Sequence, residues 1–424
     1  MKKQWIAVTL AAVCLLSACT PAVTPEDTET DTMEDTQEEI TTAEQEESTV
    51  DDENAGEDES TPVTEESSKN EDETEGDKVP ETFAEVTLPE DGKVKELFTS
   101  KDIWFTNHSK SGDGVKGTLS SWRSTDYVKL DGVYAIQYEL SACRKAYSVV
   151  FFDAEHQFIS GINTESFCTV SALVGCTPVP AGAAYARFSF YNGSTTYTTL
   201  EEPVVKLVAT EEDYQALKAA YPLSGLKIAC LGDSITEGDY GCEKPGNKRV
   251  HLENYPYYLA KNFGCETTNY GWCGDTSETF WNRFNEEKVD VSDADVVILI
   301  LGANHGLIGS KGEYYRNIVD AVRGQLKEGA TLVLCVPPYA TESTRGVEGK
   351  FFLYDDIVKA RPIIKAMAEE YGLPVIDIFT DSPIQAETES QYQPIDGIHL
   401  NREGYEVLAN FIGQQLLSIL GLGE

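Results

Sequence analysis

Basic side chains are scarce in this chain. Its 424 residues include 33 lysines and arginines against 72 aspartates and glutamates, which gives a formal net charge of −39 at pH 7. A protein that binds phosphates needs a basic surface, so this balance argues against nucleic acid as a partner. It argues equally against attraction to anionic lipid headgroups.

Signals for cofactors and metals are also missing. The chain shows no phosphate-binding loop and no glycine pattern between a predicted strand and helix that would hold a dinucleotide, so we expect no cofactor. Its ten cysteines form no CxxC pair and its five histidines do not cluster, so we expect no metal. Cys230 and Cys335 lie in apolar runs and are predicted to be buried free thiols. Two disulfides remain open as alternatives: Cys168–Cys176 and Cys242–Cys273.

The apolar segment at the N-terminus, residues 5–16, is too short to span a bilayer as a permanent helix. Small residues precede Cys19 in Leu16-Ser-Ala-Cys19, a pattern that resembles the bacterial lipoprotein signal. The resemblance implies cleavage before Cys19 and lipidation of its sulfur, with an ordinary secretory leader as the alternative. We therefore predict a signal peptide over residues 1–18. The protein would lie on the extracellular face of a bacterial cell membrane and contact it through the lipid anchor only.

An acidic stretch follows Cys19. Residues 20–80 hold 24 acidic and 2 basic side chains and almost no large apolar ones. Such a segment cannot bury enough surface to offset the entropy lost on ordering, and its like charges keep it extended. We predict a disordered linker over residues 19–81 that spaces the folded part away from the membrane.

Strand and helix patterns alternate over residues 210–424. The first apolar run, Leu226 to Leu231, ends in Gly232-Asp-Ser234, and four more strand runs follow. Apolar runs joined by helices predict a five-stranded parallel sheet covered on both faces. Ligands bind at the carboxyl ends of such strands, so Ser234 is a candidate nucleophile. The alternative is an ordinary turn in which Ser234 caps a helix.

Three later stretches bear on the role of Ser234. They are the glycine-rich stretch 269–277, Asn304 after an apolar run, and Asp396-Gly-Ile-His399 before a helical pattern. Together with Gly232-Asp-Ser234 they resemble the SGNH/GDSL hydrolase family over about residues 224–421. The resemblance implies a flavodoxin-like three-layer α/β/α sandwich. It also implies site roles: Ser234 as nucleophile and oxyanion donor, Gly274 and Asn304 as further oxyanion donors, and Asp396 and His399 as the rest of the triad.

Ester hydrolysis by such a set needs a nucleophile, a base and donors for the oxyanion. His399 belongs to the residue type whose unperturbed pKa lies near the working pH, and it is predicted to be the base. Asp396 would hold the imidazole in the right tautomer and stabilise the imidazolium. The family's third block usually reads Gly-x-Asn-Asp. Here His305 follows Asn304, which changes the local support of that asparagine.

A different pattern occupies residues 82–209. Short segments rich in aromatic and β-branched residues alternate with Gly, Asp, Asn and Pro, which predicts an all-β sandwich. It is similar to the jelly-roll modules that accompany some polysaccharide deacetylases of the family. The aromatic residues Trp104, Trp122 and Tyr127 either contact carbohydrate or belong to the core. We favour the core, since aromatic side chains in strands are mostly buried.

The resemblance and the predicted location favour a serine esterase that removes acetyl groups from a polysaccharide. Trp272, which lies between Gly271 and Gly274, would stack on a sugar or instead pack against the neighbouring helix. His305 is a second candidate substrate contact. Alternatives within the fold are a lysophospholipase and a short-acyl thioesterase. An alternative of another class is a catalytically idle carbohydrate-binding lipoprotein, against which the intact triad residues argue.

Overall fold

The computed structural model describes residues 83–106, 114–166, 168, 170–193, 197–241, 250–286, 289–304, 306–341 and 353–423. The predicted signal peptide, the lipidation site Cys19 and the linker over residues 19–81 lie outside this description, as do His305 and Cys242. Lys78–Glu424 form one compact unit. The helices within the described ranges are all too short or too polar to span a bilayer.

A five-stranded parallel sheet organises residues 211–423, which we call the α/β region. Its strand order is β15-β13-β16-β17-β18. The strands are β13 (Lys227–Gly232), β15 (Glu266–Gly271), β16 (Val296–Ile300), β17 (Thr331–Val336) and β18 (Val375–Asp377). Every residue of β16 is buried, as is every residue of β13 after Lys227, because a parallel sheet is covered on both faces. The predicted sheet is therefore confirmed.

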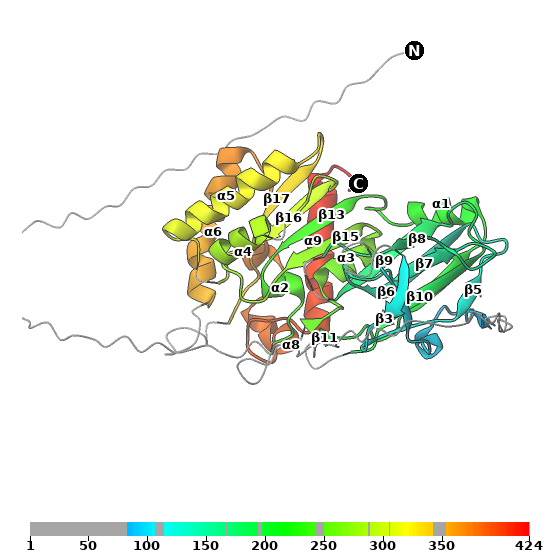
Figure 1. Ribbon diagram of the computed structural model, residues 1–424. Helices are drawn as coiled ribbons and strands as arrows, with labels where there is room; N and C mark the ends of the chain where they lie inside the picture. Colours follow the sequence, from blue (N-terminus) through cyan, green and yellow to red (C-terminus); the bar gives the residue numbers. More distant parts are fainter. Residues whose placement is uncertain are drawn as a thin grey trace, which may run out of the picture. The chain divides into compact units, whose positions relative to one another are not determined.

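Helices cover both faces of this sheet (Figure 1). Along β13, Ile228 and Cys230 face α3 and α9, whereas Ala229 and Leu231 face α4, α5 and α6. This alternation follows from the two-residue period of a strand, and it confirms the three-layer sandwich. The covering helices are α3 (Tyr255–Phe263), α4 (Ser277–Glu286), α5 (Ser310–Gln325), α6 (Leu353–Tyr371) and α9 (Arg402–Ile419). Shorter helices are α1 (Glu211–Ala219), α2 (Ser234–Glu237), α7 (Ile378–Asp381) and α8 (Glu389–Tyr392).

The turn from β13 into α2 is unusually tight. A Cβ atom on Gly232 would lie 2.3 Å from the Ile300 carbonyl oxygen, so only glycine lets β13 pass this close to β16. Asp233 is the N-cap of α2 and accepts the Ile235 amide at 3.1 Å through its side chain. Ser234 is therefore the first helical residue and not the cap. Its hydroxyl lies at the carboxyl end of β13, as predicted.

The region before the α/β region is built from strands, and we call residues 83–208 the β module. One sheet has the order β1-β5-β10-β7-β8 with β4 also paired to β10, and a second has the order β12-β6-β9. Val128, Phe151 and Phe188 from the first sheet pack against Ile136 and Val205 from the second. The predicted all-β sandwich is confirmed. Its strands are β1 (Glu85–Val86), β2 (Asp102–Phe105), β3 (Val115–Thr118), β4 (Trp122–Ser124), β5 (Tyr127–Lys129), β6 (Ala135–Ala142), β7 (Val149–Phe152), β8 (Phe158–Ile162), β9 (Ser171–Pro178), β10 (Tyr185–Tyr191), β11 (Tyr197–Thr198) and β12 (Val204–Val208).

The aromatic residues singled out in the β module belong to its core. Trp104, Trp122 and Tyr127 are 4%, 3% and 6% exposed. The guanidinium of Arg187 lies 4.8 Å from the Trp104 ring centre and 5.0 Å from that of Tyr127, so one buried cation stacks on both rings. The interpretation that these aromatics are core residues is confirmed.

The described cysteines confirm one prediction and contradict one open alternative. Cys230 and Cys335 are buried free thiols, and burial raises the pKa of Cys230 to about 12. Cys168 and Cys176 are free thiols as well, so the open alternative of a disulfide between them is wrong. A bond between Cys273 and Cys242 stays an open alternative, because Cys242 lies outside the described residues.

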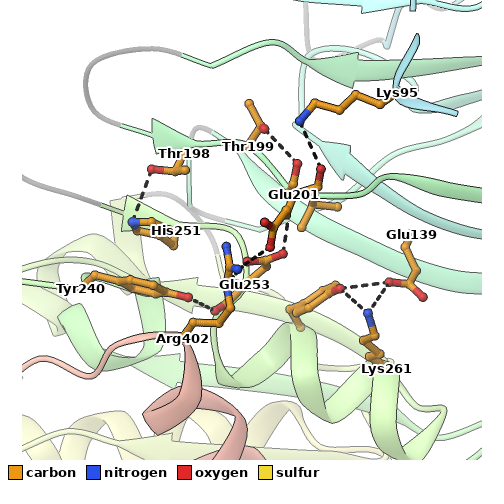
Figure 2. Close-up of polar contacts among 12 residues, drawn as sticks. Lys95, Glu139, Thr198, Thr199, Glu201, Tyr240, His251, Glu253, Lys261 and Arg402 are labelled. Atoms are coloured by element: carbon orange, nitrogen blue, oxygen red, sulfur yellow. Dashed lines mark hydrogen bonds and ion pairs between the residues drawn. The ribbon is translucent and has the colours of Figure 1, made fainter. Parts of the chain in front are cut away.

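Polar contacts join the β module to the α/β region (Figure 2). Strand β11 pairs in parallel with β14 (Val250–His251) of the α/β region. Close by, Arg402 at the start of α9 forms ion pairs with Glu201 of the β module and, at 2.6 Å, with Glu253. The module is therefore attached near the first turn of α9, the helix that follows the predicted catalytic His399.

Candidate active site

Three of the predicted residues form one continuous chain of hydrogen bonds. His399 Nε2 lies 2.9 Å from Ser234 Oγ, and His399 Nδ1 lies 2.7 Å from Asp396 Oδ2. Ser234 is buried and the other two side chains are half-buried. A serine, an imidazole and a carboxylate connected in this order are the arrangement that activates a serine hydroxyl for acyl transfer.

The loop that carries Asp396 and His399 is shaped by the aspartate itself. Asp396 Oδ1 accepts the backbone amides of Ile398 at 3.0 Å and of His399 at 2.9 Å. Gly397, between Asp396 and Ile398, has φ of +71°, and a Cβ there would lie 2.1 Å from the Thr341 methyl carbon. One carboxylate therefore orients the loop through Oδ1 and the imidazole through Oδ2.

Opposing effects set the protonation of this pair. Burial by itself lowers the pKa of His399, but the hydrogen bond to Asp396 and the charge of Asp239 outweigh it, so that pKa lies above its ordinary value. Burial by itself raises the pKa of Asp396, but its hydrogen bonds to His399 and to the loop amides hold that pKa below its usual range. Asp396 is therefore ionised at neutral pH.

The predicted oxyanion donors lie at the ends of the strands beside β13. Gly274 follows β15 and Asn304 follows β16, and both of these strands pair with β13. Gly274 has φ of +83°, and no described atom beyond its two chain neighbours lies within 4 Å of where its Cβ would be. Its amide donates to no group that the structure describes. Asn304 Nδ2 donates to the Asp275 carbonyl at 3.0 Å and carries a second hydrogen. The fold thus brings Ser234, Gly274 and Asn304 to one edge of the sheet.

The ion pair between Arg283 and Asp275, the residue whose carbonyl accepts Asn304, was not predicted from the sequence. Arg283 of α4 contacts the buried Asp275 through Nε at 3.1 Å and Nη2 at 3.2 Å. Its guanidinium also lies 4.3 Å from the Trp272 ring centre. Trp272 is half-buried and packs against Arg283 of α4. This agrees with the alternative that its indole packs against the neighbouring helix. Its contact with a sugar stays a prediction, and His305 is not described.

Two further acids near the imidazole were also missed. Asp233 is fully buried, which raises its pKa to about 7 despite the amide that it accepts from Ile235, and its Oδ2 has no partner within the described structure. Asp239 is buried and accepts the Gly241 amide at 2.8 Å. Sequence alone offers no signal that distinguishes these acids from exposed ones, because their burial depends on the packing of α2 and α9.

Other features of the described residues do not compete with this site. No group of three or more His, Cys, Asp or Glu side chains in the described ranges is arranged to hold a metal ion. A cavity of about 450 Å³ lies between the β module, α1 and α3, and Tyr214, Lys218 and Tyr221 are among its lining residues. None of Ser234, Asp396 and His399 lines it. The chain of hydrogen bonds through Ser234, His399 and Asp396, at the carboxyl ends of the parallel strands, is therefore the candidate active site.

Comparisons with known proteins give one family match and several similar solved structures. Residues 230–407 match the GDSL-like Lipase/Acylhydrolase family. A lipase/acylhydrolase from Enterococcus faecalis is 22% identical, with 47% of this chain and 99% of that one covered and a TM-score of 0.37. A carbohydrate acetylesterase family member from Sinorhizobium meliloti is 19% identical, with 46% and 99% covered and a TM-score of 0.36. No curated protein matches the chain.

We predict that Asp239→Asn lowers the pKa of His399. The charge of Asp239 favours the imidazolium, so a neutral amide in its place lets the imidazole lose its proton at lower pH. An NMR titration of the His399 side chain measures this pKa directly. Asp131→Asn, which removes the same charge from an exposed turn of the β module, serves as the control and leaves the pKa unchanged. An unchanged or raised pKa in the Asp239→Asn protein contradicts this electrostatic account.

Proposed function

We propose, from the premise that the C-terminal half of the chain carries a GDSL-like lipase/acylhydrolase domain, that this protein is a serine esterase acting on the acetyl groups of a polysaccharide. The observation that carries the proposal is the chain of hydrogen bonds from Asp396 through His399 to Ser234, at 2.7 and 2.9 Å. No further group is needed to make a serine hydroxyl nucleophilic.

In the proposed reaction, Ser234 Oγ attacks the ester carbonyl carbon while His399 Nε2 takes the hydroxyl proton. The negative charge that develops on the carbonyl oxygen is accepted by the Ser234 and Gly274 amides and by Asn304 Nδ2. The sugar oxygen then leaves with the proton held by His399, and an acetyl-enzyme remains. Water, deprotonated by the same imidazole, releases acetate and regenerates Ser234.

The choice of acetyl polysaccharide rests on the predicted location and on charge. A protein anchored through Cys19 on a long acidic linker would meet extracellular polymers and not cytoplasmic thioesters. Its net charge of −39 disfavours anionic phospholipid surfaces, which argues against a lysophospholipase. Fatty-acid labelling of the wild-type protein but not of Cys19→Ala would support the anchor, and equal labelling of both would exclude it.

A catalytically idle binding protein is the alternative of a different class. It would tolerate a broken hydrogen-bond chain, whereas here both contacts of His399 have the lengths of good hydrogen bonds. Asp396 also accepts two loop amides that hold it in place. This degree of organisation favours the esterase.

We predict that Ser234→Ala lowers the turnover of 4-nitrophenyl acetate by about 10⁴-fold without unfolding the protein, because the nucleophile is lost. Initial rates and thermal unfolding of the purified protein check both parts. Ser418→Ala, on an exposed position of α9, is the matched control and keeps wild-type turnover. Wild-type turnover by a Ser234→Ala preparation free of contaminating esterase contradicts the proposed function.

The sugar preference is tested at Trp272. If its indole contacts the glycan, Trp272→Ala should lower acetate release from acetylated xylan, pectin or peptidoglycan about tenfold more than it lowers 4-nitrophenyl acetate hydrolysis. Trp272→Phe keeps an aromatic face and should retain most of the glycan activity. Equal loss on both substrates would show that Trp272 only shapes its turn. Faster cleavage of octanoyl than of acetyl esters would move the enzyme to the lipase side of the family.

A further inference from the structure

The edge strand β15 leads directly into residues 271–275, which we call the oxyanion turn. The outer backbone groups of an edge strand need partners when they are buried. Here two partners come from the loop between β8 and β9 of the β module. The Asn269 amide donates to Ser166 Oγ at 3.0 Å. The Cys168 thiol donates to the Gly271 carbonyl at 3.6 Å.

A buried glutamate extends this contact into the oxyanion turn. Glu237, the last residue of α2, is 1% exposed, and its Oε2 accepts the Cys273 amide at 2.6 Å. Its Oε1 accepts the hydroxyl of Tyr197, from β11 of the β module, at 3.4 Å. The β module thus reaches, through the Glu237 side chain, the residue immediately before Gly274.

The oxyanion turn has little room on its other side. The Gly271 amide donates to Asn269 Oδ1 at 2.8 Å, and Asn269 Nδ2 donates to the Thr236 carbonyl of α2 at 2.7 Å. A Cβ atom on Gly271 would lie 2.2 Å from the Glu237 amide nitrogen. The turn is therefore held between α2 on one side and the β module on the other. Because α2 is closely packed against the turn, the turn cannot move toward α2. A change in its contacts with the β module can therefore displace it toward the β module.

We infer that Ser166, Cys168 and Tyr197 of the β module are positioning residues for the Gly274 amide, an inference that rests on the proposed function. An oxyanion donor is effective only when it is held in place before the reaction. A donor that is slightly displaced weakens binding of the transition state more than binding of the substrate. The β module is then a working part of the active site, whether or not it contacts carbohydrate.

The junction supplies a matched control for this inference. Tyr257 of α3 donates its hydroxyl to Glu139 of the β module at 2.9 Å, and Lys261 donates to the same carboxylate oxygen at 3.0 Å. Figure 2 shows this contact, with Glu139 and Lys261 labelled. Like the Tyr197–Glu237 contact, it joins a tyrosine to a glutamate between the β module and the α/β region. It does not involve the oxyanion turn.

The test compares Tyr197→Phe with Tyr257→Phe in the full-length protein, using 4-nitrophenyl acetate. Tyr197→Phe should lower kcat about tenfold and leave KM within twofold, since only the transition state depends on the Gly274 amide. Tyr257→Phe should leave both constants within twofold. Combining Tyr197→Phe with Ser166→Ala and Cys168→Ala should lower kcat toward the roughly 100-fold loss typical of a missing oxyanion donor.

A second readout does not depend on activity. Hydrogen exchange of the backbone amides in residues 266–275 should be faster in Tyr197→Phe than in the wild type and unchanged in Tyr257→Phe. Equal kcat in both variants, or unchanged exchange in Tyr197→Phe, would overturn the inference while leaving the esterase intact. If the wild-type protein has no esterase activity, the proposed function fails, and the exchange experiment still decides whether the module holds the turn.

Discussion

The 2.9 Å contact between Ser234 and His399 joins residues that are 165 positions apart in the chain, and the α/β region is organised so that they meet. Gly232 allows β13 to turn sharply into α2, and Asp396 folds the loop before α9 around two of its amides. The Tyr405 hydroxyl of α9 donates to the Asp239 carbonyl at 2.7 Å, which ties that helix to the segment after α2. If either side shifted, the serine would lose its base.

The electrostatic setting of that contact is crowded with acids. Asp233 and Asp239 are buried close enough to raise the pKa of His399, whereas Asp275, which is also buried, is paired with Arg283. An imidazolium formed during the reaction is therefore stabilised by Asp239 and, where it is ionised, by Asp233, in addition to Asp396. Asp233 Oδ2 has no hydrogen-bond partner within the described structure. This agrees with the pKa of Asp233, which is about 7 and leaves the carboxyl group partly protonated.

Local patterns were enough to predict much of this molecule. The alternation of strand and helix patterns predicted the five parallel strands. The site residues could be named because short motifs carry them. The contacts that reach the oxyanion turn could not, because Cys168 and Gly271 are 103 positions apart and nothing local marks either one. Likewise, the stack of Trp272 on Arg283 depends on how α4 packs beside the turn.

Covalent trapping tests the central claim most directly. A fluorophosphonate forms a phosphorus–oxygen bond with an activated serine and releases fluoride, so the reaction reports both the nucleophile and its base. Peptide mass spectrometry should find the label on Ser234 alone, and His399→Ala should abolish labelling. A label on another residue, or full labelling of Ser234 without the imidazole, would contradict the account of Ser234 as a nucleophile activated by His399.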